Sequence, residues 1–288
     1  MTSVPPPPTA PPGPRPELPE GARRAPPDPG PGWPWWMAPT ALVLGLVAPI
    51  TLVVLFVIAG VDVKSGSDSG PVALVLTAAQ DLAFIGAALF LARQSGRARP
   101  EDFGLRATPF WRAVGFAALA AVVYLVFSTV WNAAVAGSQH QDDVFKELGV
   151  HRGSTAGIAV LALLICVLAP IAEEFLFRGF CFEALRPRFG VLGAAIAVGA
   201  VFGAVHATST PAALIVELGM LGFLLCLLRW RTGSLYPCIG LHALNNAISF
   251  GALLGWGWQI PPLVAGSLAV IFLVLRPIGA RSASASAA

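Results

Sequence analysis

The chain has 288 residues, of which 56% are hydrophobic and 11% charged, and its formal net charge is +3. A soluble globular domain has about 45–50% apolar and about 25% charged residues, so this composition excludes an ordinary water-soluble protein. With a mean hydropathy of +0.74, the chain is expected to be a multi-pass protein of the cell membrane with the lipid bilayer as its partner. Backbone groups in lipid must be satisfied within the spanning segments, which predicts an all-α helical bundle. No basic and aromatic module for nucleic acid is present, so no nucleic-acid partner is expected.

Residues 1–36 form a proline-rich segment that holds 14 of the 26 prolines and almost no large aliphatic side chains. Such a segment cannot bury a core, which predicts a disordered cytoplasmic leader. It lacks the apolar region of a cleavable signal peptide before Trp33. The cluster Trp33, Trp35 and Trp36 is typical of an aromatic belt at the membrane interface.

Eight apolar runs follow, and most reach the roughly 17–25 residues that a spanning helix needs. They lie at 38–60, 71–92, 113–136, 156–185, 190–208, 211–228, 235–254 and 260–275. We therefore expect about eight transmembrane helices, with a kink at Pro170 in the long fourth run. The predicted regions are three helices with loops at 37–154, a catalytic core at 155–276 and a disordered tail at 277–288.

The positive-inside rule predicts the orientation of these helices. With the N-terminus inside, the cytoplasmic side holds 14 of the 18 Lys and Arg residues, whereas only Lys64, Lys146 and Arg152 lie outside. Arg178 falls within a span and is left uncounted. Both termini are therefore predicted to be cytoplasmic.

Glu173 and Glu174 stand side by side near the end of the apolar stretch 158–176, with Arg178 just beyond. An ionised carboxylate in the bilayer costs a few kcal/mol on insertion scales, so such groups are retained mainly where they function. Adjacent carboxylates repel each other and favour sharing of a proton, which poises one of them as a base. Glu174 and Arg178 are spaced i,i+4 and can pair, whereas Glu173 points about 100° away. A purely structural ion cluster is the alternative.

Two further polar clusters lie on separate runs. His206 ends the sequence FGAVH, and His242 stands four residues before Asn246 in LHALNN. His242 and Asn246 share a helix face and present two donors that suit the oxyanion of acyl transfer. At 1.5 Å per residue, antiparallel packing brings Glu173 and His206 to similar depths, because they lie roughly 21 and 28 Å from the predicted turn near residue 187. Structural packing of either histidine stays an open alternative.

The ordered motifs EExxxR, FxxxH and HxxxN, each on its own apolar run, resemble the CPBP family of CAAX proteases and bacteriocin-processing proteins. That family includes the type II CAAX prenyl endopeptidases and the bacterial Abi proteins, and its members are often named metalloproteases. The resemblance covers about residues 158–250, and FGLR at 103–106 is similar to bacterial members.

The resemblance implies an eight-helix endopeptidase whose active site lies inside the bundle. Glu173 and His206 would then activate the attacking water, and His242 and Asn246 would stabilise the oxyanion. Glu174 and Arg178 would orient the site. The substrate would be a membrane-associated peptide or a lipidated protein with a CAAX-like end.

A zinc ion held by Glu173, His206 and His242 is an alternative, with one position left open for water. The HExxH spacing of many zinc proteases is absent, and His242 with Asn246 suits an oxyanion without any ion. We favour metal-free activation of water, so no cofactor is firmly expected.

Other polar groups in the apolar runs have two interpretations each. Asp81 either lines the cavity or makes a structural contact, for example with Asn132. Glu217 either holds a histidine or closes a helix contact, and Glu183 is expected to pair with Arg186. The four cysteines form no CxxC pair and are interpreted as small buried hydrophobic residues.

Two other classes of function compete with the peptidase. One is a non-catalytic scaffold or bacteriocin-immunity protein that binds peptides in the same cavity. The other is a proton-coupled transporter, which the lack of internal repeats disfavours.

Overall fold

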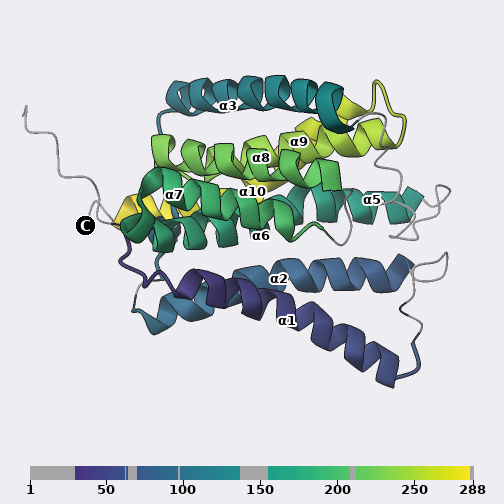
Figure 1. Cartoon of the computed structure of the whole chain (residues 1–288), viewed down its shortest axis with the longest axis horizontal. Coiled ribbons are helices and arrows are strands. Elements are labelled where there is room, and N and C mark those ends of the chain that lie inside the picture. Colours follow the sequence, from purple (N-terminus) through teal and green to yellow (C-terminus); the bar gives the residue numbers. More distant parts are fainter. Residues whose placement is uncertain are drawn as a thin grey trace, which may run out of the picture.

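The computed structural model describes residues 30–61, 63, 70–96, 98–136, 155–207 and 212–285. Within these ranges every regular element is a helix, as the composition predicts (Figure 1). The elements are α1 (Met37–Ile58), α2 (Gly70–Gln94), η2 (Pro100–Phe103), α3 (Phe110–Trp131), η3 (Asn132–Ala136), α5 (Thr155–Leu163), η4 (Leu164–Leu168), α6 (Ala169–Glu174), η5 (Phe175–Cys181), α7 (Phe182–Ala204), α8 (Ala212–Thr232), α9 (Tyr236–Leu253) and α10 (Ile260–Ala285).

The helices form a layered bundle. In Figure 1, α1 and α2 lie along one edge and α3 along the opposite edge, with the helices from α5 to α10 between them. The element pairs α7–α8, α1–α2, α9–α10 and α3–α8 are in close contact. Residues 1–29 of the predicted leader 1–36 lie outside the described residues.

Six stretches in the described part of the chain are long and apolar enough to cross a membrane. They are Met37–Ile58, Pro71–Gln94, Phe110–Val135, Thr155–Ala204, Ala212–Thr232 and Ile260–Ile278. Gly190, with φ 70°, interrupts the helical dihedrals of the 50-residue stretch Thr155–Ala204. The protein is therefore a multi-pass membrane protein, whereas the number eight and the orientation of the termini stay predictions.

Two π-helical stretches flank the short helix α6 that carries both adjacent glutamates. η4 precedes α6 and η5 follows it, and Pro170 lies at the start of α6 directly after η4. Proline has no N–H for an intrahelical bond, so a locally widened helix is a suitable place for it. Every residue of η5 is buried, as expected for a segment surrounded by other helices.

Glycines let α7 and α8 approach closely at the centre of the bundle. A Cβ atom added at Gly199 would lie 2.7 Å from the Gly219 carbonyl oxygen, and one at Gly203 would clash with the carbonyl oxygen of Ile215. Small residues at helix interfaces allow such contact between backbones in membranes. This packing fixes the depth of the end of α7, where His206 follows.

The FGLR segment joins the α2–α3 connection to the turn between α8 and α9. The Leu235 N–H donates to the Gly104 carbonyl at 2.7 Å, and the Ser234 hydroxyl donates to the Arg106 carbonyl at 2.7 Å. Arg106 Nε in turn donates to the Gly233 carbonyl at 2.7 Å. Gly104 has φ 84°, a left-handed conformation that glycine adopts without strain.

The last part of the leader differs from the prediction, because Trp33 is packed inside the protein. Trp33 is only 2% exposed, and its ring lies 4.9 Å from Phe103 and 4.6 Å from Phe180. Trp35, at 49% exposed, is open to the surroundings as an interfacial residue would be. The aromatic residues of η2 and η5 bury the indole and order this end of the leader.

The C-terminal region also differs from the prediction of a disordered tail at 277–288. Helix α10 continues through Pro277 to Ala285. Ile271 and Leu275 are buried in the core, and Ile278 packs against it. These contacts extend the packed face of α10 beyond the predicted end of the apolar run.

The polar contacts of Glu217 and Glu183 test the pairings considered from the sequence. Glu217 on α8 closes a contact with α3, where it accepts hydrogen bonds from Ser128 and from Asn132. Asn132 therefore binds Glu217, and the suggested pairing with Asp81 is wrong. Glu183 accepts from Arg186 at 2.8 Å, as expected, and also pairs with Arg229 at 3.1 Å.

Candidate active site

A fully buried ion pair forms the base of the site. Arg178 Nη1 on η5 donates to Glu174 Oε1 on α6 at 2.6 Å, and both side chains are 0% exposed. The i,i+4 pairing expected from the sequence is therefore present. Burying two charges costs several kcal/mol each unless geometry and further hydrogen bonds are good, so additional partners are expected around this pair.

Aromatic rings and a glycine enclose the Arg178 guanidinium. Its carbon lies 4.4 Å from the centroid of the Phe202 ring, which gives a cation–π contact. A Cβ atom added at Gly222 would lie 3.1 Å from Arg178 Nη2. Helices α7 and α8 thus both contact the arginine.

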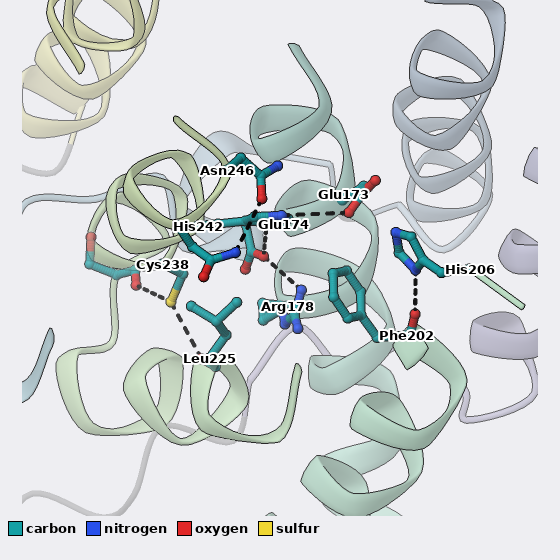
Figure 2. A network of polar contacts seen from close by, with 11 residues as sticks. Glu173, Glu174, Arg178, Phe202, His206, Leu225, Cys238, His242 and Asn246 are labelled. Carbon is teal, nitrogen blue, oxygen red and sulfur yellow. Dashed lines mark hydrogen bonds and ion pairs between the residues drawn. The ribbon is translucent and has the colours of Figure 1, made fainter. Parts of the chain in front are cut away.

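His242 on α9 connects the two glutamates (Figure 2). Its Nδ1–H donates to Glu174 Oε1 at 2.8 Å, and its Nε2 lies 3.8 Å from Glu173 Oε2. Because Nδ1 carries the proton given to Glu174, Nε2 is the nitrogen presented to Glu173. Glu174 therefore orients the ring and also selects which nitrogen is available for chemistry.

Glu173 is the more accessible of the two glutamates. Its side chain is 14% exposed, whereas that of Glu174 is completely buried. This difference follows from the rotation of about 100° between successive residues of a helix. Glu174 is committed to Arg178 and His242, and Glu173 remains within reach of a molecule that enters the bundle.

His206 lies in the turn directly after α7 and contacts the group through Phe202. Its Nδ1–H donates to the Phe202 carbonyl at 2.7 Å, so its Nε2 is the nitrogen able to accept a proton. The Phe202 ring lies 5.1 Å from the His206 ring and 5.7 Å from the His242 ring. Phe202 is therefore in van der Waals contact with both imidazoles and with Arg178.

Asn246 lies one turn after His242 on α9 and faces η4. Its Nδ2 donates to the Ile165 carbonyl at 3.0 Å. The amide has a second N–H, so this bond fixes the side chain without using all of its donors. Asn245, in contrast, donates to Asn246 Oδ1 at 3.4 Å.

The tertiary structure brings two further residues to the site, Phe202 and Asp81, and only for Asp81 was a place at the cavity one of the sequence-based interpretations. Phe202 was noted only as the first residue of FxxxH, and its ring contacts Arg178, His206 and His242. Asp81 on α2 is buried and interacts electrostatically with Glu173. An acidic residue in the middle of an apolar run was the available signal for Asp81.

The described residues do not gather the donor set of the zinc alternative. Among them no group of three or more His, Cys, Asp and Glu side chains lies close enough together to hold a metal ion. Each histidine donates Nδ1–H, His206 to the Phe202 carbonyl and His242 to Glu174, which leaves Nε2 as the only nitrogen of each ring that could bind a metal. The residues in this arrangement do not fit a metal ion, and no chemical step below passes through one.

Comparison with family models gives a match over residues 155–248, to the family described as type II CAAX prenyl endopeptidase Rce1-like. The matched segment begins with α5, ends within α9 and contains all six candidate site residues. Comparisons with curated proteins and with solved structures found no match.

Proposed function

We infer the function of this chain from the match of residues 155–248 to the family described as type II CAAX prenyl endopeptidase Rce1-like. We propose that it is an intramembrane endopeptidase of the cell membrane that hydrolyses a peptide bond in a membrane-associated substrate. The observation that carries this proposal is the position of His242, held by the buried Glu174–Arg178 pair with its second nitrogen 3.8 Å from Glu173.

Glu173 and His206 are the proposed activators of water. Glu173 is a partly exposed carboxylate beside a buried polar network, and His206 presents Nε2 as a proton acceptor. In the first step the water oxygen attacks the scissile carbonyl carbon while one water proton moves to the Glu173 carboxylate. General base catalysis of this kind contributes about 10²- to 10⁴-fold to a rate.

His242 and Asn246 are the proposed donors to the oxyanion. Donation by His242 Nε2 requires the imidazolium form, because Nδ1–H is already given to Glu174. The second N–H of Asn246 would supply the other hydrogen bond.

The second step breaks the C–N bond of the tetrahedral intermediate. The oxyanion returns its electron pair to the carbonyl, and the proton held by Glu173 moves to the departing amine nitrogen. Atoms and charges then balance as peptide plus water giving a carboxylic acid and an amine. Glu174 and Arg178 undergo no bond change and position His242 throughout.

The proposed substrates are peptides held in or at the bilayer. The family name specifies prenylated CAAX ends, and a lipid anchor would bring such a peptide to a site built on spanning helices. A peptide carried by a transmembrane helix is the other substrate form to be tested. In either case the scissile bond must reach Glu173.

The test uses purified chain in liposomes with three fluorescence-quenched peptides of one sequence: farnesylated, fused to a transmembrane helix, and unmodified. We expect cleavage of an anchored peptide, a loss of at least 10²-fold in Glu173→Gln, and a comparable loss in His206→Ala. Glu101→Gln, the same substitution at a residue beside Arg99 on η2, is the matched control and should keep the wild-type rate.

Two outcomes would defeat the proposal. One is the absence of cleavage of all three peptides by folded wild-type chain. The other is cleavage at the wild-type rate by Glu173→Gln. Repeating the assay with a strong chelator tests the zinc alternative separately, because a metal-dependent enzyme would lose its activity.

A further inference from the structure

Asp81 is a buried carboxyl group on α2, outside the segment that matches the family. It is 3% exposed, and its Oδ2 has no hydrogen-bond partner among the described residues. A buried polar oxygen without a partner costs about 1–3 kcal/mol, so such an atom needs an explanation. In a membrane-spanning helix a carboxyl group is retained mainly where it has a function.

The packing of α2 places Asp81 beside the candidate site. Phe84 lies edge-on to Phe177 of η5, with ring centroids 5.9 Å apart. Asp81 precedes Phe84 by three residues and Glu173 precedes Phe177 by four, so each acid lies about one turn before its aromatic neighbour on the same face. Helix α2 and the helices α5 and α6 run in the same direction in Figure 1, so the contact between Phe84 and Phe177 puts both acids at similar depth.

The contacts between helices agree with this register. Helix α2 is in contact with α6, which carries Glu173, and the Asp81 and Glu173 carboxyl groups are near enough for their charges to repel. The neighbouring Gln80 donates its amide to the Gly45 carbonyl of α1 at 3.1 Å. Gln80 thus holds α1, and Asp81 points about 100° away from it around α2.

We propose that Asp81 and Glu173 together bind the attacking water, with Asp81 Oδ2 accepting the hydrogen bond from the O–H that is not transferred. This role rests on the peptidase function proposed above. A water molecule has two O–H groups, and Glu173 removes the proton of only one. If the second O–H is also held, the oxygen lone pair points away from both carboxyl groups and toward the scissile carbonyl.

The chemical step leaves Asp81 unchanged. One water proton goes to Glu173 and later to the amine nitrogen, while the other stays on the hydroxyl of the intermediate and then on the product acid. The Glu174 Oε2 atom also has no hydrogen-bond partner among the described residues, but Glu174 is held in place by Arg178 and His242 through Oε1 and its side chain is completely buried. It also points about 100° away from Glu173 around the helix.

The test compares Asp81→Leu, Asp81→Asn and the control Gln80→Leu in the liposome assay, with the anchored peptide that wild-type chain cleaves. A misplaced reacting atom costs about 10²-fold. We therefore expect Asp81→Leu to lower kcat about 10²-fold and to change KM less than threefold. Asp81→Asn should recover most of that loss, because its amide oxygen accepts the same bond. Gln80→Leu removes a polar contact between helices and should keep the wild-type kcat.

Each other outcome has a defined meaning. A wild-type kcat per folded molecule in Asp81→Leu, or a loss in KM alone, would overturn the role of Asp81 and leave the peptidase intact. Failure of wild-type chain to cleave any peptide would overturn both. Should Asp81→Leu not fold, Asp81→Ala replaces it with the same expectations.

Discussion

Arg178 is the residue whose removal should destabilise the protein most through electrostatics. In Arg178→Met the Glu174 carboxylate stays fully buried and loses its 2.6 Å partner, and the methionine roughly preserves side-chain length. Breaking a buried ion pair from one side costs about 3–5 kcal/mol, because the remaining charge is uncompensated. The lost contact with the Phe202 ring, at 4.4 Å, acts in the same direction.

The measurement is equilibrium unfolding in mixed micelles, followed by tryptophan fluorescence, for the single variant and for Glu174→Gln/Arg178→Met. We expect the single variant to lose about 3–5 kcal/mol, and the double variant to recover at least half of that loss, since no buried charge is left unpaired. Peptide cleavage should fall in both variants. In the single variant the Glu174 carboxylate loses the arginine that holds it, and in the double variant His242 no longer has a carboxylate to orient it.

Arg186→Met is the matched control. Arg186 lies 2.8 Å from Glu183, but it is partly exposed and Glu183 keeps Arg229 as a second partner. The expected loss is therefore below about 1 kcal/mol. A loss in Arg178→Met as small as in this control, or a double variant no more stable than the single one, would refute the reasoning.

Three further changes test the packing around the site. Gly203→Val should lower the free energy of unfolding by more than about 2 kcal/mol, because its Cβ would meet the backbone of α8. The control Gly86→Ala on α2 should be neutral or slightly stabilising, because a Cβ atom there has no neighbour within 4 Å. Trp33→Ala should lose about 3–5 kcal/mol and Trp35→Ala less than about 1, because only the first ring is buried. Glu217→Gln should lose about 1–3 kcal/mol while keeping the wild-type kcat, because it replaces one acceptor of the α3–α8 contact by a donor. Equilibrium unfolding in micelles measures the changes in free energy, and the peptide assay measures kcat. The packing described would be contradicted if Gly86→Ala lost more stability than Gly203→Val, or Trp35→Ala more than Trp33→Ala.

Local spacing explains why part of the site was predictable. Glu174 and Arg178 are four residues apart, so helix geometry alone brings them together, and the 2.6 Å contact agrees. Apolar run length likewise located the helices, and the non-helical Gly190 lies at the predicted boundary between the runs 156–185 and 190–208. Both predictions depend only on residues that are close to one another in the sequence.

Contacts between distant residues were not available from spacing. The bond from His242 to Glu174 joins residues 68 positions apart, and the shared face of His242 and Asn246 indicated only that they point in one direction. The burial of Trp33 and the continuation of α10 past Pro277 likewise depend on partners from other helices. No local pattern identifies those partners.

From its residues alone, the chain is recognisable as a helical membrane protein with carboxylates, imidazoles and an amide on three apolar runs, because composition and helical periodicity are local properties. Only the packing of α2, α6, α7 and α9 determined which of these groups bind one another. Glu174 is the buried partner of Arg178 and His242, and Glu173 is the more accessible carboxylate. The physical reason is that a charge in lipid is stabilised by the groups that surround it in space, and helix packing brings those groups together.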